Sequence, residues 1–205
     1  MRRKLLQSIT LIFAMLIALS ACGDKSTEII DSEEDNYGNL DFDYREAMQN
    51  IHFFEKKISL PATLNNMGED FTIDERILLP TDTNDLTTTL RYKDETIGNV
   101  LLQNCTKEDE DKRSKQIIAL TLGDGVNLPS TTSYWYNEII PIEFLGLTFK
   151  SSEYQVRETL GVPSFEKEMP LVNQLYYKNS SEEYLKITVK DSKIVEITFR
   201  FTGEN

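Results

Sequence analysis

Histidine is almost absent from this chain, in which His52 is the only one among 205 residues. A zinc site would need further histidine or cysteine ligands, and the chain has just two cysteines, Cys22 and Cys105. A Ser-His-Asp triad would have to use His52, and no G-x-S-x-G motif is present. We therefore expect no metal, no cofactor and no enzymatic activity, and we interpret His52 as a surface or edge-strand residue.

Glycine is also sparse, and its nine residues form no phosphate-binding loop. Residues 122–129, LGDGVNLP, hold two glycines at turn spacing but lack the Lys-Ser/Thr pair of such loops. The 34 acidic residues outnumber the 22 basic ones. In so acidic a chain, paired carboxylates are uninformative about glycosidase chemistry, and binding to nucleic acid is not expected. An envelope hydrolase is kept only as a third alternative.

The N-terminus has the pattern of an export signal. Arg2, Arg3 and Lys4 precede a mostly apolar stretch over residues 5–21, after which the chain turns acidic. Residues 19–22, LSAC, resemble the lipobox of bacterial lipoproteins. The resemblance implies a signal peptide over residues 1–21, cleavage before Cys22, and acyl chains on Cys22. These would anchor the protein in the membrane at the extracytoplasmic face of the bacterial cell.

Removing residues 1–21 takes away three basic residues and changes the formal charge from −12 to −15. Residues 23–43 carry eight acidic side chains against one lysine, and like charges keep a segment extended. We expect a flexible acidic tether over residues 22–45. With Cys22 acylated, Cys105 has no partner for a disulfide, and we interpret it as a small buried residue.

Two segments of the remaining chain resemble each other. Residues 90–102, LRYKDETIGNVLL, share Leu-x-Tyr-Lys with residues 175–187, LYYKNSSEEYLKI. Downstream, KQIIALTLG echoes SKIVEITFR when residues 120–122 are aligned on residues 197–199. This similarity predicts two related units, over residues 46–130 and 131–205.

The second unit has the clearer pattern. Ser152 and Gln155 form a capping box that predicts a short helix, which ends at Gly161 before Pro163. Apolar and polar residues then alternate, which predicts three antiparallel strands over residues 171–177, 183–190 and 193–201. Alternation also places Tyr176 and Tyr177 on opposite faces, so one of them is expected in the core.

The first unit is less regular. Residues 51–61, IHFFEKKISLP, predict a strand, a turn at Glu55, Lys56 and Lys57, and a returning strand. A short helix is expected to start at Pro61, because the first helical position needs no N–H donor. Three strands are predicted near residues 86–93, 96–104 and 115–122.

The arrangement in residues 142–201 resembles the β-lactamase-inhibitor-protein-like fold and the SmpA/OmlA (BamE) type of outer-membrane assembly lipoprotein. The shared pattern comprises Leu147 and Phe149, a small polar cap, a helix ending in Leu-Gly-x-Pro, and an aromatic strand. Residues 50–123 match it only loosely. The resemblance implies an α+β fold of two tandem units, each a short helix with an antiparallel meander. It also implies a concave face that grips partner proteins, and it carries over no catalytic residue.

Aromatic side chains are therefore the candidate binding residues, because they bury much area with few rotatable bonds. The candidates are Tyr134, Trp135, Tyr136, Tyr92, Tyr177 and Tyr184. For Trp135 the alternative is that it fills the seam between the two units. The expected function is a non-catalytic protein-binding or assembly module of the bacterial envelope. The alternative is a lipoprotein that binds a solute or glycan in an aromatic groove between the repeats.

Overall fold

The computed structural model describes residues 40–53, 56–93, 95–123 and 141–202. In this part of the chain the fold is α+β, with mainly antiparallel strands and a few short helices, as predicted. The elements are α2 (Tyr44–Met48), β1 (Ile51–Phe53), β2 (Lys56–Ile58), β3 (Ala62–Thr63), α3 (Leu64–Met67), β4 (Phe71–Pro80), β5 (Leu86–Tyr92), β6 (Glu95–Leu102), the 3-10 turn η1 (Lys112–Ser114), β7 (Gln116–Gly123), β8 (Ile142–Glu143), α5 (Glu153–Leu160), β9 (Phe165–Glu168), β10 (Asn173–Lys178), β11 (Tyr184–Lys190) and β12 (Lys193–Arg200).

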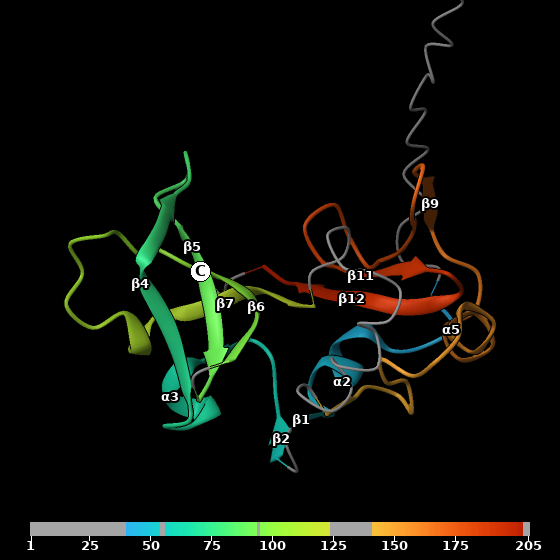
Figure 1. Cartoon of the computed structure of the whole chain (residues 1–205), viewed down its shortest axis with the longest axis horizontal. Helices are drawn as coiled ribbons and strands as arrows, with labels where there is room; N and C mark the ends of the chain where they lie inside the picture. Colours follow the sequence, from blue (N-terminus) through green and yellow to red (C-terminus); the bar gives the residue numbers. More distant parts are fainter. Residues whose placement is uncertain (1–39, 54–55, 94, 124–140, 203–205) are drawn as a thin grey trace, which may run out of the picture. The chain divides into compact units, whose positions relative to one another are not determined.

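One antiparallel sheet holds most of these strands, in the order β4-β5-β6-β7-β12-β11-β10-β9. It consists of two four-stranded meanders, β4 to β7 and β9 to β12, in each of which neighbours in sequence are neighbours in space. The last strands of the two meanders, β7 and β12, pair with each other at the centre of the sheet (Figure 1). Residues 119–123 thereby meet residues 196–200.

The second meander matches the predicted elements closely. Helix α5 starts after Ser152, and the predicted capping box with Gln155 is present. Gly161 follows the helix with a φ of 77°, a positive value that glycine adopts readily. Strands β10, β11 and β12 lie at the predicted positions. Their predicted core side is buried, but the predicted outer side is not accessible throughout, because Thr188 and Thr198 are buried as well.

The first meander departs from the prediction at its helix. Helix α3 begins at Leu64 and is capped by the Thr63 side chain, whereas the helix was expected to start at Pro61. The intervening residues Ala62 and Thr63 form β3, which pairs with β7. The strong capping box between Thr63 and Asn66 decides the start of the helix, and this pairing holds the preceding residues extended.

Four strands were not predicted, the two-residue strands β3 and β8 and the longer strands β4 and β9. Both β4 and β9 contain charged residues where alternation should appear. Asp74 to Arg76 interrupt β4, where the pairing with β5 shifts register between Ile73 and Leu78. Three of the four residues of β9 are charged. A bulge and an accessible edge strand both tolerate such residues, so the period-2 signal is lost from the sequence.

One face of the sheet is buried from β5 to β10. Cross-strand partners on this face form two continuous rows, Thr88–Val100–Leu120–Phe199–Leu185–Tyr177 and Leu90–Gly98–Leu122–Ile197–Ile187–Leu175. A second sheet, in the order β2-β1-β8, supplies further core residues. Phe53 of β1 stacks on Phe71 with ring centroids 5.3 Å apart, and Phe144, which follows β8, meets Phe199 at 5.2 Å. The two meanders therefore share one hydrophobic core.

The N-terminal boundary of this core corrects the predicted tether. Residues 40–45 were expected to be flexible, but Tyr44 is buried in α2, and Leu40 and Phe42 pack against the core. The Tyr44 hydroxyl donates a hydrogen bond of 2.5 Å to the Arg200 carbonyl oxygen. Burial, with a contribution from Glu183, raises the pKa of this phenol above its usual value. Among the described residues, no helix has the length and apolar character needed to cross a bilayer.

Candidate protein-binding face

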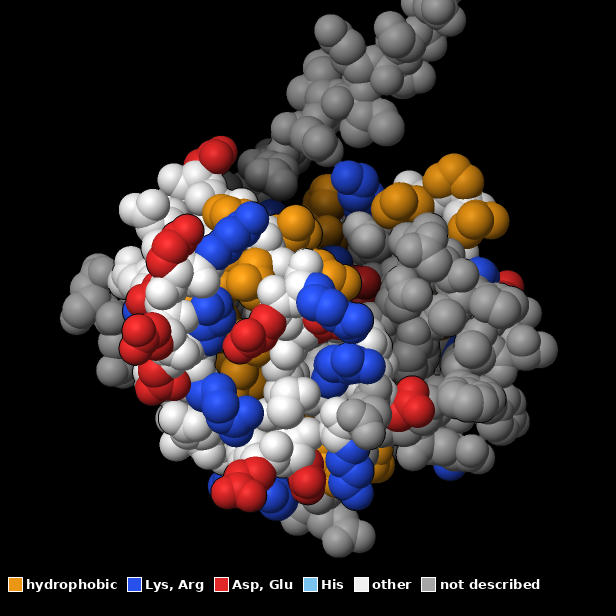
Figure 2. Space-filling view, turned by 60° about the vertical axis from the view of Figure 1, so that its left-hand side comes forward, with side chains coloured by type: hydrophobic (Ala, Val, Ile, Leu, Met, Phe, Trp, Pro, Cys, Tyr) orange, Lys and Arg blue, Asp and Glu red, His pale blue; other side chains and the backbone are white. Residues whose placement is uncertain are grey.

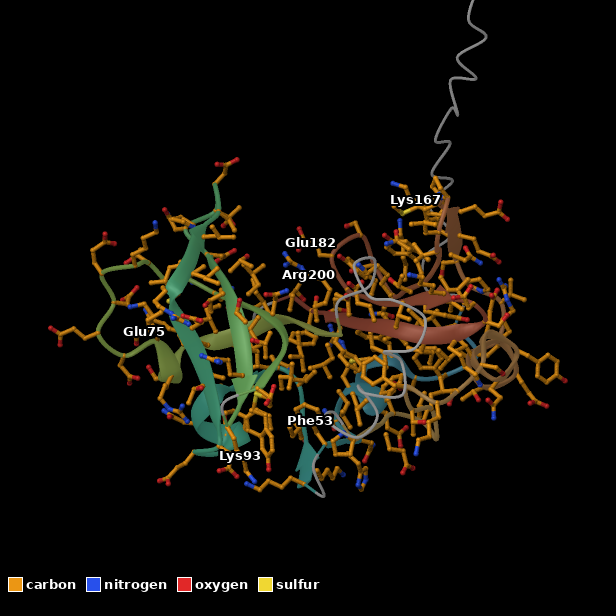
Figure 3. All side chains as sticks on the ribbon, viewed as in Figure 1. Phe53, Glu75, Lys93, Lys167, Glu182 and Arg200 are labelled. Atoms are coloured by element: carbon orange, nitrogen blue, oxygen red, sulfur yellow. The ribbon has the colours of Figure 1, made fainter. Side chains whose placement is uncertain are left out.

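The opposite face of the main sheet has no layer of described secondary structure paired to it, and we call it the open face. We define it by three cross-strand rows that the register of the strands places side by side. They are Thr87–Leu101–Ala119–Arg200–Tyr184–Lys178, Thr89–Asn99–Thr121–Thr198–Lys186–Tyr176–Phe165 and Glu196–Thr188–Gln174–Lys167. Figure 3 shows Arg200 of this face and Phe53 of the core on opposite sides of the central strands.

An aromatic strip crosses the open face of the second meander. The Phe165 and Tyr176 ring centroids are 5.6 Å apart, and those of Tyr176 and Tyr184 are 5.8 Å apart. The Lys178 ammonium lies 5.4 Å from the Phe165 ring centroid, within the range of a cation–π contact. All three aromatic side chains are half-buried. The strip thus offers flat apolar surface at fixed positions, held in place by its own neighbours.

The open face carries more positive than negative charge, unlike the chain as a whole. Its three rows hold the cations Arg200, Lys178, Lys186 and Lys167 against the single carboxylate of Glu196. The Glu196 carboxylate forms an ion pair of 2.8 Å with the Lys186 ammonium and accepts a hydrogen bond of 3.0 Å from the Thr188 hydroxyl. Figure 2 shows lysine and arginine side chains interspersed with acidic ones on the face in view.

A shallow hollow of about 250 Å³ lies where the two meanders meet on this face. Its floor is polar, because the Thr121 and Thr198 hydroxyls bond each other at 3.1 Å across the β7–β12 junction. Arg200, Tyr184 and other side chains of the first two rows form its walls. A hollow of this shape suits a side chain of another molecule better than it suits an enclosed small ligand.

Two other hollows in the described part of the chain are bordered by α2 or by glycines of the main sheet. One, of about 320 Å³, lies between α2 and the end of β12 and is bordered by Arg45 and Glu183. Burial opposes ionisation of Glu183, but hydrogen bonds from Thr202 and Asn179 outweigh it, so the pKa of Glu183 lies below its usual value. The other, of about 400 Å³, lies beside Gly98 and Gly123 next to the open face. Charged or polar groups border both hollows.

The predicted binding residues fall into three groups. Tyr184 lies on the open face, whereas Tyr177 is fully buried and its hydroxyl donates to the Gly161 carbonyl at 3.4 Å. Tyr177 was therefore wrong as a binding residue, and the neighbour that alternation places outside is Tyr176. Tyr92 was also misplaced, because it packs on the core side against Phe71, with ring centroids 5.1 Å apart.

The other predicted positions lie outside the described residues. They are the aromatic triplet Tyr134, Trp135 and Tyr136 and the lipidation site Cys22. The choice between a binding role and a seam role for Trp135 therefore stays open.

His52 and Cys105, the residues considered for catalysis or metal binding, lie in different surroundings. His52 is exposed on β1, in register with Lys57 on one side and Glu143 on the other, so it lies on a central strand and not at an edge. Cys105 is 1% exposed, and burial raises the pKa of its thiol. Among the described residues, no group of three or more His, Cys, Asp or Glu side chains is arranged to hold a metal ion.

Sequence reasoning missed Phe165 and Arg200 as site residues, although one signal was present. Alternation along residues 193–201 already places Arg200 on the outer face. Its partners across the sheet depend on the β7–β12 pairing, which joins residues far apart in the sequence and leaves no local pattern. Comparison of the chain with protein-family models, curated proteins and solved structures gives no match.

Proposed function

We propose that this protein is an exported bacterial lipoprotein whose folded part binds another envelope protein through the open face. The anchoring part rests on the lipobox-like LSAC segment and the acidic residues that follow it. Expression of the full chain and its Cys22→Ala variant in bacteria tests it. Fatty-acid labelling and membrane fractionation are expected to detect the parent chain in the membrane, and both signals are expected to be lost in the variant. An unmodified Cys22 in a membrane-free parent chain would contradict anchoring.

The two meanders are further proposed to be copies of one unit, as the sequence similarity predicts. When residues 120–122 are aligned on residues 197–199, exchanging the aligned residues leaves the set of cross-strand pairs between β7 and β12 unchanged. Thr121 pairs with Thr198, the middle residues of the two triplets, and the flanking residues pair crosswise. A register of this kind is expected at a pseudo-twofold axis between copies.

A second correspondence supports the same axis. In each half, a capping box precedes the helix, and its cap residue pairs with the first residue of the last strand. Thr63 pairs with Gln116 in the first half, and Ser152 bridges to Lys193 in the second. Upstream of the helices, residues 51–53 and 142–144 share the pattern Ile-x-Phe, and their middle residues lie opposite each other.

The ladders also adjust the sequence alignment. Followed from strand to strand, Leu90 corresponds to Tyr177, two residues beyond Leu175. A shift of two residues leaves every side chain on its original face, so the pattern survives the adjustment.

The binding function rests on one observation, the aromatic strip of Phe165, Tyr176 and Tyr184 beside an excess of cations on a sheet face to which no described helix or strand is paired. Tyrosine and arginine dominate the energetics of protein interfaces because they combine apolar area with polar contacts. The open face is the surface that the proposed fold family would use to grip a partner.

Site-specific photo-crosslinking tests this function in the full chain. A benzoylphenylalanine at position 176 or 184 is expected to yield a discrete adduct with one protein upon irradiation in bacterial membranes. Position 154 is the matched control, because Tyr154 is 72% exposed on α5 and lies off the open face. Equal adducts at all three positions, or none, would argue against binding by this face. Retention on peptidoglycan that depends on Tyr176 and Tyr184 would favour the glycan-binding alternative.

A further inference from the structure

Arg200 differs from every other arginine in the described part of the chain. The other five each bind an acceptor of the same chain. Arg45 pairs with Glu183, Arg76 and Arg91 with Asp74, Arg157 with Glu153 and Glu166, and Arg113 with the carbonyls of Leu64, Gly68 and Phe71. The Arg200 guanidinium makes no hydrogen bond or ion pair with any described residue, although it is half-buried.

The position of Arg200 is fixed by the core. Its strand, β12, is paired on both sides, and its carbonyl accepts the hydrogen bond from Tyr44. Its neighbours in the row are Ala119 and Tyr184. Ala119 is too short to cover the guanidinium, which therefore borders the hollow at the meeting of the meanders.

The surrounding groups favour an incoming anion. Lys186 is already paired with Glu196, so Arg200 is the cation of this hollow to which no described residue supplies an acceptor. Glu182 lies on the same side of the sheet in Figure 3, but no ion pair joins it to Arg200. The Thr121 and Thr198 hydroxyls and the Asn99 side chain add hydrogen-bonding capacity at the floor and wall.

We propose that Arg200 is a carboxylate-binding position, and that the partner is a protein that inserts an Asp or Glu side chain into this hollow. The proposal rests on the proposed function of the open face and names the chemistry of its partner.

The planar guanidinium presents paired N–H donors that match a carboxylate. The aromatic strip begins at the neighbouring Tyr184 and continues along the same face, so it can contact the apolar side chains that flank an acidic residue in a polypeptide. An external carboxylate would give the guanidinium an acceptor that no described residue supplies.

Binding of labelled peptides to the full chain in detergent tests the proposal by fluorescence anisotropy. The probes are fluorescein-Ac-(Glu-Val)₄-NH₂ and its glutamine counterpart, at low and at moderate salt. The variants are Arg200→Gln and Arg200→Lys, and Lys57→Gln is the matched control. Lys57 is an exposed cation on the other sheet, so its loss changes the net charge equally.

Arg200→Gln is expected to weaken binding of the glutamate peptide by about tenfold or more, as for loss of a charge-assisted hydrogen-bonded pair. Arg200→Lys is expected to recover only part of it, and Lys57→Gln to change it less than about twofold. The glutamine peptide is expected to bind weakly to every variant. Equal loss in Arg200→Gln and Lys57→Gln, no saturable binding of the glutamate peptide, or full displacement by millimolar inorganic phosphate would overturn the proposal.

The two proposals fail in different ways. If crosslinks at positions 176 and 184 persist while Arg200→Gln binds the glutamate peptide normally, the open face still binds a protein but not through a carboxylate at Arg200. If the crosslinks are absent, the proposed function itself fails, whatever the peptides do.

Discussion

On the core side of the sheet, the two meanders present rows of the same character, aliphatic and aromatic residues that are fully buried. On the open side they differ. The first meander contributes threonine, asparagine, leucine and alanine, whereas the second carries tyrosine, phenylalanine, lysine and arginine in addition to threonine, glutamine and glutamate. The comparison separates positions that maintain the fold from positions available for binding, and it assigns the binding chemistry mainly to the second meander.

The largest expected effect comes from the shared core at the junction. Phe199→Ala removes a ring that is fully buried and packs against Phe144. We expect it to lower the free energy of unfolding by about 3–5 kcal/mol, because the cavity adds to the lost burial. Chemical denaturation followed by circular dichroism measures this. Leu120→Ala, at the paired position of β7, is expected to cost about 2–5 kcal/mol. A small effect of both would contradict a core common to the two meanders.

The next largest effect concerns the end of helix α3. Arg113 holds the end of α3 by donating to the Phe71 carbonyl at 2.6 Å and to the Gly68 carbonyl at 3.1 Å. Arg113→Ala is expected to destabilise the protein by about 2–3 kcal/mol, because it leaves these carbonyls without a charged donor. Arg113→Lys cannot reach several acceptors at once and is expected to recover little of the loss. Full recovery by lysine, measured in the same unfolding experiment, would show that only the charge matters.

The ion pairs of Arg157 should contribute less and should depend on pH. Hydrogen bonds from Arg157 outweigh burial and hold the pKa of Glu166 below its usual value. Its ionised form therefore favours the folded state above the unfolded pKa near 4.5, and this contribution is lost as the pH falls through the lower folded pKa. The free energy of unfolding is expected to fall between about pH 5 and 3, and less steeply in Arg157→Gln. At pH 7 that variant should cost only about 0.5–1 kcal/mol, because the pair is partly exposed. An unchanged slope would contradict this assignment.

The sequence predicted the second meander better than the first, for physical reasons. In β10 to β12, apolar and polar residues alternate over most of each strand because one face is wholly buried, and the capping box at Ser152 fixes the helix. In the first meander, the bulge in β4 and the late start of α3 at Leu64 break the local patterns. The site was less predictable than the fold. Tyr184 could be placed from alternation. The surroundings of Arg200 depend on Ala119, which is 81 residues away in sequence and adjacent only through the β7–β12 ladder.

The smallest effect concerns the junction itself. The hydroxyls of Thr121 and Thr198 bond each other where the meanders meet, and this contact belongs equally to both. Thr121→Val and Thr198→Val keep the side-chain shape, so each should cost at most about 1–1.5 kcal/mol. The double variant should cost less than the sum, with a coupling of about 0.5–1 kcal/mol, because the second substitution removes a hydroxyl whose partner is already gone. A double-mutant cycle by denaturant unfolding measures this coupling. The pair Thr121→Val with Thr89→Val serves as the control, since these threonines lie in the same row two strands apart and no hydrogen bond joins them. Strict additivity at Thr121 and Thr198 would mean that the junction depends on backbone pairing and the core beneath it, and that its side chains are free to serve binding alone.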